Sequence, residues 1–363
     1  MSGTCWSRSG MRASALLAAA VIAAAVICSA AAAPSGLTVG GVELNLPPLP
    51  YGMDGKVTRA LEVVEGAMNR VEEVVNVGWK HMLDNYSEFA ITAGGTFVVH
   101  EVLYFAAWIP WLLLDLVPGA RRWKIQKPRA TALEDTDQLW KCFKGIAWSH
   151  VVIELPMMMI FHFVVALMGF EIGMPLPGWK TFVWQVPLFF VIEDTYFYWG
   201  HRFLHWKKIY KYIHKVHHEH QSPFGIAAEY AHPLETVFLG IGTVLGPFLF
   251  AKHLASLWVW LAFRLWETIE DHSGYDVPFN PTNLIPFWGG PVHHDFHHKN
   301  FDGNYASVFT YWDWIMGTDR DFQSKQLAGK PGLGYPLRFR GAAQRGRAAA
   351  EKAAADKAAK KAK

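Results

Sequence analysis

Eight histidines stand in three short runs of this sequence, and this pattern constrains the fold more than any other feature. The runs read His-x3-His, His-x2-His-His and again His-x2-His-His, with histidines at His201, His205, His214, His217, His218, His294, His297 and His298. Residues three or four positions apart project from one face of a helix, so the imidazoles of each run can converge on one point. Imidazole is a common ligand of zinc, copper, iron and nickel, and the spacing therefore predicts metal sites. The fold must bring together segments as distant as 201 and 298.

The number of histidines indicates more than one metal ion. A first-row ion accepts at most about six ligands, whereas His232 and His272 lie near the three runs and add to their eight histidines. We therefore predict a two-metal centre with neutral nitrogen ligands. Ferritin-like di-iron sites instead use two Glu-x-x-His motifs together with two further Glu, a set that this sequence does not contain. Many carboxylates can accept the second N–H of an imidazole and so orient it: Glu193, Asp194, Glu219, Glu229, Glu267, Glu270, Asp271 and Asp295.

Long apolar stretches predict an integral membrane protein. Of the 363 residues, 52% are hydrophobic and 18% are charged, and a helix needs ~20 apolar residues to cross a bilayer. The stretches are about Phe89 to Leu116, Ile146 to Phe170, Thr181 to Tyr198 and Thr236 to Leu265. The last contains Gly246-Pro247, so we expect a hairpin of two short segments. The expected fold class is all-α integral membrane, with about four membrane-embedded helices or hairpins and a cytosolic helical cap carrying a histidine-rich dimetal site. A helical soluble core is the competing interpretation.

Basic residues orient these stretches. Five basic residues follow the first stretch, between 121 and 129, and five flank the first two histidine runs, between 202 and 215. The turn at 171–180 has only Lys180. Because cytosolic loops are enriched in Lys and Arg, we expect the histidine runs in the cytosol and this turn in the lumen. A hairpin at 236–265 keeps His272 and His294 on the same side as His218.

The remaining segments divide the chain into five regions. Residues 1–35 have basic residues before an alanine-rich apolar run, as in a secretory signal or signal anchor; an organelle transit segment is the alternative. Residues 36–87 form a pre-membrane region in which 57–75 is predicted to be an amphipathic helix. Transmembrane helices are expected over 88–180 and the catalytic region over 181–320. A basic cytosolic tail, 321–363, ends in Lys360-Lys361-Ala362-Lys363, which resembles a dilysine retrieval signal of the endoplasmic reticulum or is a solvated basic tail.

Other features argue against several function classes. The cysteines, Cys5, Cys28 and Cys142, are scattered, so neither a disulfide framework nor a Cys-x-x-Cys metal site is expected. The formal net charge of +3 is too small to indicate nucleic-acid binding. His100-Glu101 begins like a zinc-protease helix but lacks the second histidine. No flavin, haem or nicotinamide site is evident, so electrons for a redox reaction are expected from a partner with an acidic docking surface.

A histidine-rich two-metal site at a membrane surface suits oxygen chemistry on a lipid. Iron with neutral ligands can bind O2 and oxidise an unactivated C–H bond, and the membrane delivers a substrate that water does not dissolve. The alternative from a different class is a polytopic metal-binding or transport protein. Transporters place ionisable residues inside their spans. The histidine runs instead follow the third stretch among lysines and arginines, which favours an enzyme.

Segments around the histidine runs resemble the C-4 methylsterol oxidases of the fatty acid hydroxylase and sterol desaturase superfamily. The segments are Lys211-Tyr-Ile-His-Lys-Val-His-His-Glu219, Ala228-Glu-Tyr-Ala-His-Pro233, His293-His-Asp-Phe-His-His298, Gly303-Asn-Tyr-Ala-Ser307 and Trp312-Asp-Trp-Ile-Met-Gly-Thr-Asp319. The resemblance covers about 182–319 and is weak over the first 90 residues and the tail. It implies a sterol C-4 methyl monooxygenase of sterol biosynthesis, which uses O2 to oxidise the C-4 methyl group of 4,4-dimethyl- or 4-methylsterols to the carboxylate. Sterol C-5 desaturases, sterol hydroxylases and fatty acid hydroxylases are the alternatives within the class.

The resemblance also implies cofactors, ligands and partners. It implies a non-haem di-iron centre held by the three histidine runs, and His232 and His272 complete a set of ten ligands. Fatty acid hydroxylases have a His-x3-His near His272, but position 268 is Thr here, which leaves the ninth and tenth ligands open. His220, His253 and His293 are expected to be bystanders or to support the ligands. NAD(P)H would supply electrons through cytochrome b5 and its reductase, and a sterol C-4 decarboxylating dehydrogenase complex would take the product. The implied compartment is the endoplasmic reticulum membrane, with the histidine motifs and the C-terminus in the cytosol.

Overall fold

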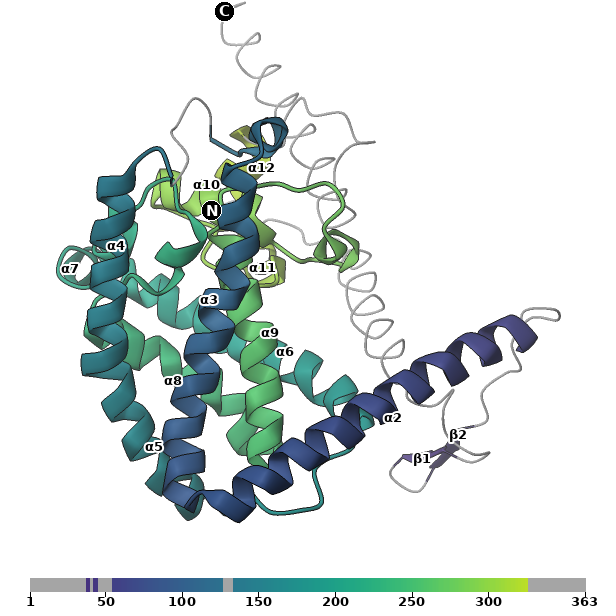
Figure 1. Cartoon of the computed structure of the whole chain (residues 1–363). Coiled ribbons are helices and arrows are strands. Elements are labelled where there is room, and N and C mark those ends of the chain that lie inside the picture. The colour runs from purple at the N-terminus through teal and green to yellow at the C-terminus, as the bar shows by residue number, and fades with distance from the viewer. Residues whose placement is uncertain (1–36, 40–41, 45–53, 127–132, 326–363) are drawn as a thin grey trace, which may run out of the picture. The chain divides into compact units, whose positions relative to one another are not determined.

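The structure, a computed structural model, describes residues 37–39, 42–44, 54–126 and 133–325. The predicted signal or anchor segment lies outside these residues, as do the dilysine ending and all of the tail after residue 325. The described ranges are helical apart from one antiparallel pair of three-residue strands, β1 (Leu37–Val39) and β2 (Val42–Leu44) (Figure 1). The expected all-α class is confirmed.

The chain divides into two compact units, and the first consists of residues 1–86 and 173–187. Its main element is α2 (Asp54–Asn85), which contains the helix predicted for 57–75 and extends it. Side chains of α2 bind the start of α6 (Trp179–Leu204). Glu72 accepts a hydrogen bond from the Trp179 backbone N–H at 3.2 Å, and Asn69 accepts one from the Trp179 indole at 3.1 Å.

The second unit consists of residues 87–172 and 188–363, and it holds all three histidine runs. Besides the rest of α6, its α-helices are α3 (Thr96–Asp115), α4 (Thr136–Ser149), α5 (Leu155–Leu167), α7 (Lys207–Tyr210), α8 (Pro233–Phe250), α9 (Leu254–Asp271), α10 (Gly290–Asn300), α11 (Tyr311–Met316) and α12 (Arg320–Lys325). Its shorter turns are the π-helical η1 (Ala90–Gly95) and η3 (His150–Glu154) and the 3-10 helices η2 (Pro118–Trp123), η4 (His217–Glu219), η5 (Gly225–Glu229) and η6 (Pro281–Leu284).

Packing of α3 along α9 forms the core that supports the histidine-bearing loops (Figure 1). Tyr104 of α3 is fully buried and donates a hydrogen bond to the Ile226 carbonyl at 2.6 Å. The Trp258 indole of α9 donates to the Thr96 hydroxyl at 2.9 Å. Each fully buried large side chain of this core contributes about 1.5–3 kcal/mol through the hydrophobic effect. The core therefore holds η5, which follows the second histidine run, in a defined place.

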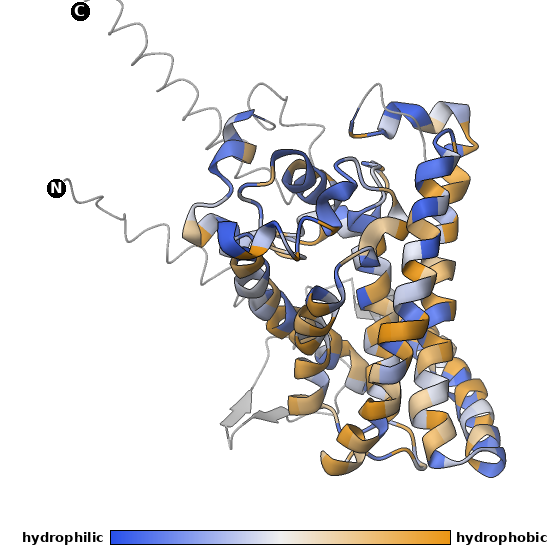
Figure 2. Cartoon of the chain, turned by 90° about the vertical axis from the view of Figure 1, so that its left-hand side faces the viewer, coloured by the Kyte–Doolittle hydropathy of each residue, from blue (hydrophilic) through white to orange (hydrophobic). Residues whose placement is uncertain are grey.

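Three helical stretches among the described residues are long and apolar enough to cross a membrane: Ala90–Asp115, Thr136–Leu167 and Pro233–Phe250. They contain the first, most of the second and the beginning of the fourth predicted stretch. The third predicted stretch, Thr181 to Tyr198, is helical within α6 but does not meet the same criterion, because Gln185, Glu193 and Asp194 lower its mean hydropathy. Figure 2 shows apolar residues along the long helices and hydrophilic residues at the end that carries α10.

The predicted hairpin at 236–265 is present, but its turn lies later than expected. The helices α8 and α9 are separated by the three residues 251–253, and Pro247 lies inside α8. A proline within a helix removes the hydrogen bond to the carbonyl four residues earlier. That carbonyl, of Thr243, accepts a hydrogen bond from the Trp260 indole of α9 at 2.7 Å. The second helix thus satisfies the group that the proline leaves free, and α8 continues to Phe250.

Candidate metal centre

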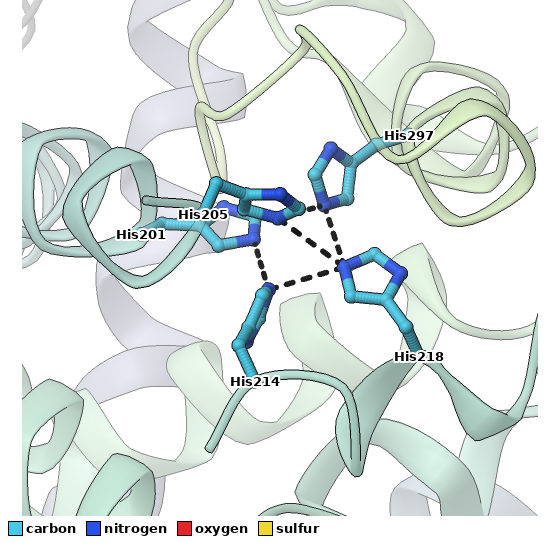
Figure 3. A group of neighbouring side chains, drawn as sticks. All are labelled: His201, His205, His214, His218 and His297. Atoms are coloured by element: carbon cyan, nitrogen blue, oxygen red, sulfur yellow. Dashed lines mark hydrogen bonds between the residues drawn. The ribbon is translucent and has the colours of Figure 1, made fainter. Parts of the chain in front are cut away.

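Five imidazoles converge in what we term the first histidine cluster: His201, His205, His214, His218 and His297 (Figure 3). His201 lies in the last turn of α6 and His205 directly follows this helix, His214 and His218 come from the chain after α7, and His297 comes from α10. The Nε2 atoms of His201 and His214 are 2.9 Å apart, and His218 Nε2 lies 3.1 Å from those of both His214 and His297. All five ligand atoms lie within 4.8 Å of one another.

Four imidazoles form the second histidine cluster: His217, His272, His294 and His298. The Nε2 atom of His272 lies 3.3 Å from that of His217 and 3.0 Å from that of His294. The His298 and His294 Nε2 atoms are 3.1 Å apart. Each His-His pair is divided between the clusters, because neighbouring residues of a helical turn point in different directions. This division places the two clusters side by side.

Hydrogen bonds at Nδ1 decide which nitrogen of each ring faces its cluster. His201 Nδ1 lies 2.8 Å from the Tyr305 carbonyl, and His297 Nδ1 lies 2.7 Å from the Gly303 carbonyl. A carbonyl oxygen only accepts, so Nδ1 carries the proton and donates it. In the second cluster His272 Nδ1 donates in the same way to the Thr268 carbonyl at 2.7 Å. The Nε2 atoms therefore present lone pairs toward each other.

Burial keeps these imidazoles neutral. It lowers the pKa of His214 and of His297 to about 3 and that of His217 to about 4. Burial also lowers the pKa of His201 and His294 well below the usual value, and repulsion among neighbouring imidazoles adds to this effect. A neutral imidazole is the form that binds a metal ion. The ligand atoms are therefore ready for metal at neutral pH.

The two clusters fit metal ions better than they fit hydrogen bonding. Nitrogen ligands bound at about 2.0–2.1 Å from one ion lie about 3 Å apart, and the Nε2 separations have this size. Where an acceptor holds the proton on Nδ1, as in His201, His214 and His297, the Nε2 atom has no proton to share with its neighbours. His218 Nδ1 and His294 Nδ1 are buried without a hydrogen-bond partner in the part of the chain that the structure describes. Five and four nitrogens would leave open coordination positions for a reacting molecule, since six is the usual limit.

Two buried aspartates hold the loop whose carbonyls orient the first cluster. Asp313 accepts hydrogen bonds from the Tyr305 and Ala306 backbone N–H groups at 2.9 and 2.8 Å. Asp194 accepts one from the Val308 N–H at 2.8 Å. Bonds between backbone N–H groups and carboxylates are among the stronger hydrogen bonds in proteins. Asp313 thereby fixes the Tyr305 peptide whose carbonyl accepts from His201 Nδ1, and Asp194 holds the same loop at Val308. Both aspartates thus support the imidazoles through the backbone.

Nine of the ten predicted ligands lie in the two clusters, and His232 does not. His232 precedes α8, and its Nδ1 accepts a hydrogen bond from the Leu234 backbone N–H at 3.2 Å. His253 caps α9 in the same manner. His220 supports the second cluster, since its carbonyl accepts from His298 Nδ1 at 3.1 Å. Of the two residues that the resemblance left open, His272 lies in the second histidine cluster and His232 caps a helix.

Glu235 is the supporting carboxylate that the sequence reasoning missed. It lies in the first turn of α8, is buried, and approaches His214 Nδ1 at 2.7 Å. The available signal was an isolated acidic residue at the start of an apolar run. A buried carboxylate in such a place needs a partner, and an imidazole of the preceding histidine run supplies one.

A cavity of about 260 Å³ lies against both clusters. Its walls include ligands of the first cluster, His201 and His214, and of the second, His217, His272 and His294. Apolar side chains from α5, α8 and α9 form most of the remainder, including Phe161, Leu239 and Leu261. Such a cavity accepts an apolar molecule and brings it against the histidines.

Comparison with known proteins places these features in a family. Residues 186–318 match the fatty acid hydroxylase family. The chain is 45% identical over 276 residues to methylsterol monooxygenase 1 of Rattus norvegicus, which covers 75% of this chain and 93% of that protein. It is 44% identical over 266 residues to methylsterol monooxygenase 1 of Danio rerio, covering 72% and 90% of the two chains. A very-long-chain aldehyde decarbonylase of Oryza sativa subsp. indica is 43% identical over 248 residues, covering 68% and 91%. No solved structure gives a significant match.

The family assignment rests on agreement between sequence and geometry. The match at 186–318 includes all nine clustered histidines, and the similarity to the rat and zebrafish proteins extends over most of both chains. The chain therefore belongs to the methylsterol monooxygenase family and carries its two histidine clusters within a fatty acid hydroxylase domain.

Proposed function

We propose that this protein is a membrane monooxygenase that oxidises the C-4 methyl group of 4,4-dimethyl- or 4-methylsterols to the carboxylate with O2, in sterol biosynthesis. The observation that carries the proposal is the pair of convergent histidine clusters on the wall of an apolar cavity. Proteins named methylsterol monooxygenase, 44–45% identical over most of their length, support the choice of substrate.

The metal that we propose for the two clusters is iron, one ion in each. His201, His205, His214, His218 and His297 would hold one ion, and His217, His272, His294 and His298 the other. When bound, iron with nitrogen ligands supplies O2 activation and oxidation of an unreactive C–H bond. The chain itself keeps the imidazoles neutral and oriented through Glu235 and the carbonyls of Tyr305, Gly303 and Thr268.

The cavity would place the substrate and exclude water. Leu257, Leu261 and Leu265 of α9 line it together with Met157, Met158 and Phe161 of α5. Apolar walls bind the rings of a sterol through the hydrophobic effect. They also keep water away from the reacting carbon, which limits wasteful side reactions.

Electron supply and location follow from the same proposal. We propose that NAD(P)H reduces the enzyme through cytochrome b5 and its reductase, and that a sterol C-4 decarboxylating dehydrogenase complex consumes the product. The exposed basic residues Lys207, Lys208 and Lys211 beside the first cluster suit an acidic electron-transfer partner. We place the enzyme in the endoplasmic reticulum membrane, with the histidine clusters and the C-terminus in the cytosol.

A second candidate activity comes from the relatives in rice. These proteins are named very-long-chain aldehyde decarbonylases and are 43% identical to this chain. A long-chain aldehyde is also apolar and would fit the same cavity. Assays should therefore include such an aldehyde beside the sterol.

The deciding experiment gives purified protein a 4,4-dimethylsterol, O2, NADPH, cytochrome b5 and its reductase, with product identification by mass spectrometry. We expect oxidised carbon at C-4, ending in the carboxylate, and no product when cytochrome b5 is omitted. A parallel reaction contains a saturated very-long-chain aldehyde. Loss of its carbonyl carbon with an unchanged sterol would refute the proposed function and favour the activity named for the rice relatives.

A further inference from the structure

A second group of buried ionisable side chains lies outside the histidine clusters, and we term it the His–Glu cluster: His100, Glu101, His150, Glu154 and Glu229. Glu101 Oε1 lies 3.2 Å from His100 Nδ1 and 2.8 Å from His150 Nδ1. Glu229 approaches the opposite nitrogens, with 3.2 Å to His100 Nε2 and 3.0 Å to His150 Nε2. The two imidazoles and these two carboxylates alternate in a closed ring.

A local change of helix type brings two members of this cluster together. His150 and Glu154 begin and end the π-helical turn η3 between α4 and α5. Pro156 lies two residues after Glu154 and cannot donate a backbone hydrogen bond, so the regular α-helical pattern is interrupted there. Such π-helical turns are rare in proteins as a whole, and those that occur are often found at functional sites. Here the turn directs both side chains toward α3.

Glu154 is the one member of the His–Glu cluster that lies outside this ring. Its Oε1 atom is buried and has no hydrogen-bond partner within the described residues, and the whole residue is 7% exposed. His150 Nε2 lies 3.6 Å from Glu154 Oε1 and His100 Nε2 lies 3.6 Å from Glu154 Oε2, and both nitrogens already face Glu229. An unpaired buried carboxylate oxygen is costly. A hydrogen-bond donor from a ligand would remove this cost.

The His–Glu cluster lies on the same cavity as the histidines. His100, Glu154 and Glu229 line the cavity that also meets both histidine clusters. Glu229 is next in sequence to Tyr230, whose carbonyl accepts a hydrogen bond from His217 Nδ1 at 3.3 Å. A group bound by this cluster therefore lies in the same cavity as the two histidine clusters. His100 and Glu154 lie outside the matched domain at 186–318, so this part of the cavity is an addition to the domain.

We propose that the His–Glu cluster is the binding site for the 3-hydroxyl group of the sterol, with Glu154 Oε1 accepting the hydroxyl hydrogen. This inference rests on the proposed function. In a sterol the hydroxyl oxygen and a C-4 methyl carbon are separated by three bonds. A site that oxidises this methyl group must therefore meet the hydroxyl on the same stretch of cavity wall. A hydroxyl group donates one hydrogen bond, and Glu154 Oε1 is a buried acceptor without a hydrogen-bond partner among the described residues.

The arrangement of protons favours a hydroxyl over a metal ion at this place. Each imidazole of the His–Glu cluster has a carboxylate at both ring nitrogens, which favours a proton on each nitrogen and leaves no lone pair for a metal. In the two histidine clusters, by contrast, the Nε2 atoms face only other Nε2 atoms.

The test compares three substrates with the full-length enzyme and its electron donors: a 4,4-dimethylsterol, its 3-O-methyl ether and its 3-deoxy analogue. We expect the wild-type kcat/KM to fall about 10- to 100-fold for both analogues, mainly through KM, because a buried charged hydrogen bond is lost. Glu154→Leu should reduce this preference to a few-fold by lowering activity on the hydroxysterol alone. Glu154→Gln keeps an amide oxygen as acceptor and should retain most of the preference for the 3-hydroxysterol. Glu134→Gln, at an exposed glutamate paired with Arg121, is the matched control and should behave as wild type.

Two further measurements make each outcome decisive. Binding of the three sterols to the purified protein, measured without turnover, should show the same order. Equal binding and equal turnover of all three by the wild type would overturn the inference while leaving C-4 oxidation intact. Absence of any C-4 product would instead refute the proposed function, and the binding order would still decide the hydroxyl site. The metal content of Glu154→Leu should equal that of the wild type; loss of a bound ion would identify the cluster as a metal site and overturn the inference.

Discussion

Glu235 Oε1 accepts a hydrogen bond from His214 Nδ1 at 2.7 Å, and both side chains are almost completely buried. The contact joins the first turn of α8 to the first histidine cluster. It keeps the proton on Nδ1, so the His214 lone pair faces the Nε2 atoms of His201 and His218. A carboxylate at this position also makes the imidazole a stronger ligand.

Glu235→Ala should weaken metal binding in the first cluster by about 10- to 100-fold, because His214 loses its orienting partner. Glu235→Gln should weaken metal binding less than Glu235→Ala, since its amide oxygen still accepts the hydrogen bond. Metal content after dialysis against graded chelator measures the effect. Glu65→Gln, at an exposed residue paired with Lys180, serves as the control. Equal metal retention by Glu235→Ala and the wild type would contradict the role given to this contact.

Alanine substitutions at His217 and His232 should have different effects on the metal content of the protein. His217→Ala removes one of the four nitrogens of the second cluster, so the purified chain should hold about one ion where the wild type holds about two. His232→Ala should keep both ions and lose only a helix cap, at a cost of up to about 1 kcal/mol. Elemental analysis and thermal unfolding of both variants separate the cases. If His232→Ala also lost an ion, His232 would have to be counted as a ligand.

The metal-free protein should lose stability as the pH falls below 6.5. The folded pKa values of His214 and His217, about 3 and about 4, lie below the ordinary value of 6.5. Between these values the unfolded chain binds protons that the folded chain does not, so acid favours unfolding. In this pH range each such histidine lowers the free energy of unfolding by up to about 1.4 kcal/mol for each pH unit of acidification. Unfolding midpoints of chelator-treated protein at pH 7.5 and 5.5 should show the fall. Metal-loaded protein should resist it, and a midpoint that rises in acid would show that the sign is wrong.

Membrane orientation can be tested with two exposed positions. Lys208 lies beside the first histidine run and Glu171 in the turn after α5, and both are exposed. In a variant without native cysteines, Lys208→Cys should react with an impermeant thiol reagent only from the cytosolic face. Glu171→Cys should react only when the lumenal face is open. Labelling of both from the same side would refute the proposed topology, because it places α6 between them across the membrane.

The clustering of histidines was predictable because its signal is local. A spacing of three or four residues determines that His294 and His298 share one face of a helix, whatever surrounds it. The apolar stretches and the hairpin at 236–265 were predictable for the same reason, since length and hydropathy depend on neighbouring residues alone. The position of the hairpin turn was not, because the bond from Trp260 to the Thr243 carbonyl involves the next helix.

Which histidine joins which cluster was decided only by the tertiary structure. His217 and His218 are adjacent in sequence, yet one faces His272 and the other faces His297. His232 and His272 were predicted equally as additional ligands, but His232 caps a helix and His272 lies in the second histidine cluster.

The pairing of carboxylates with imidazoles depended on the tertiary structure even more than the division of the histidines did. Glu229 meets His100 across 129 positions of sequence, and no local pattern reports that contact. The sequence by itself determined a helical membrane protein with histidines in numbers suited to two metals, because periodicity and composition act over a few residues. The packing of α3, α8 and α9 decided which buried carboxylates would meet those imidazoles. Hydrogen bonds and ion pairs form between whatever side chains the folded chain brings within about 3 Å.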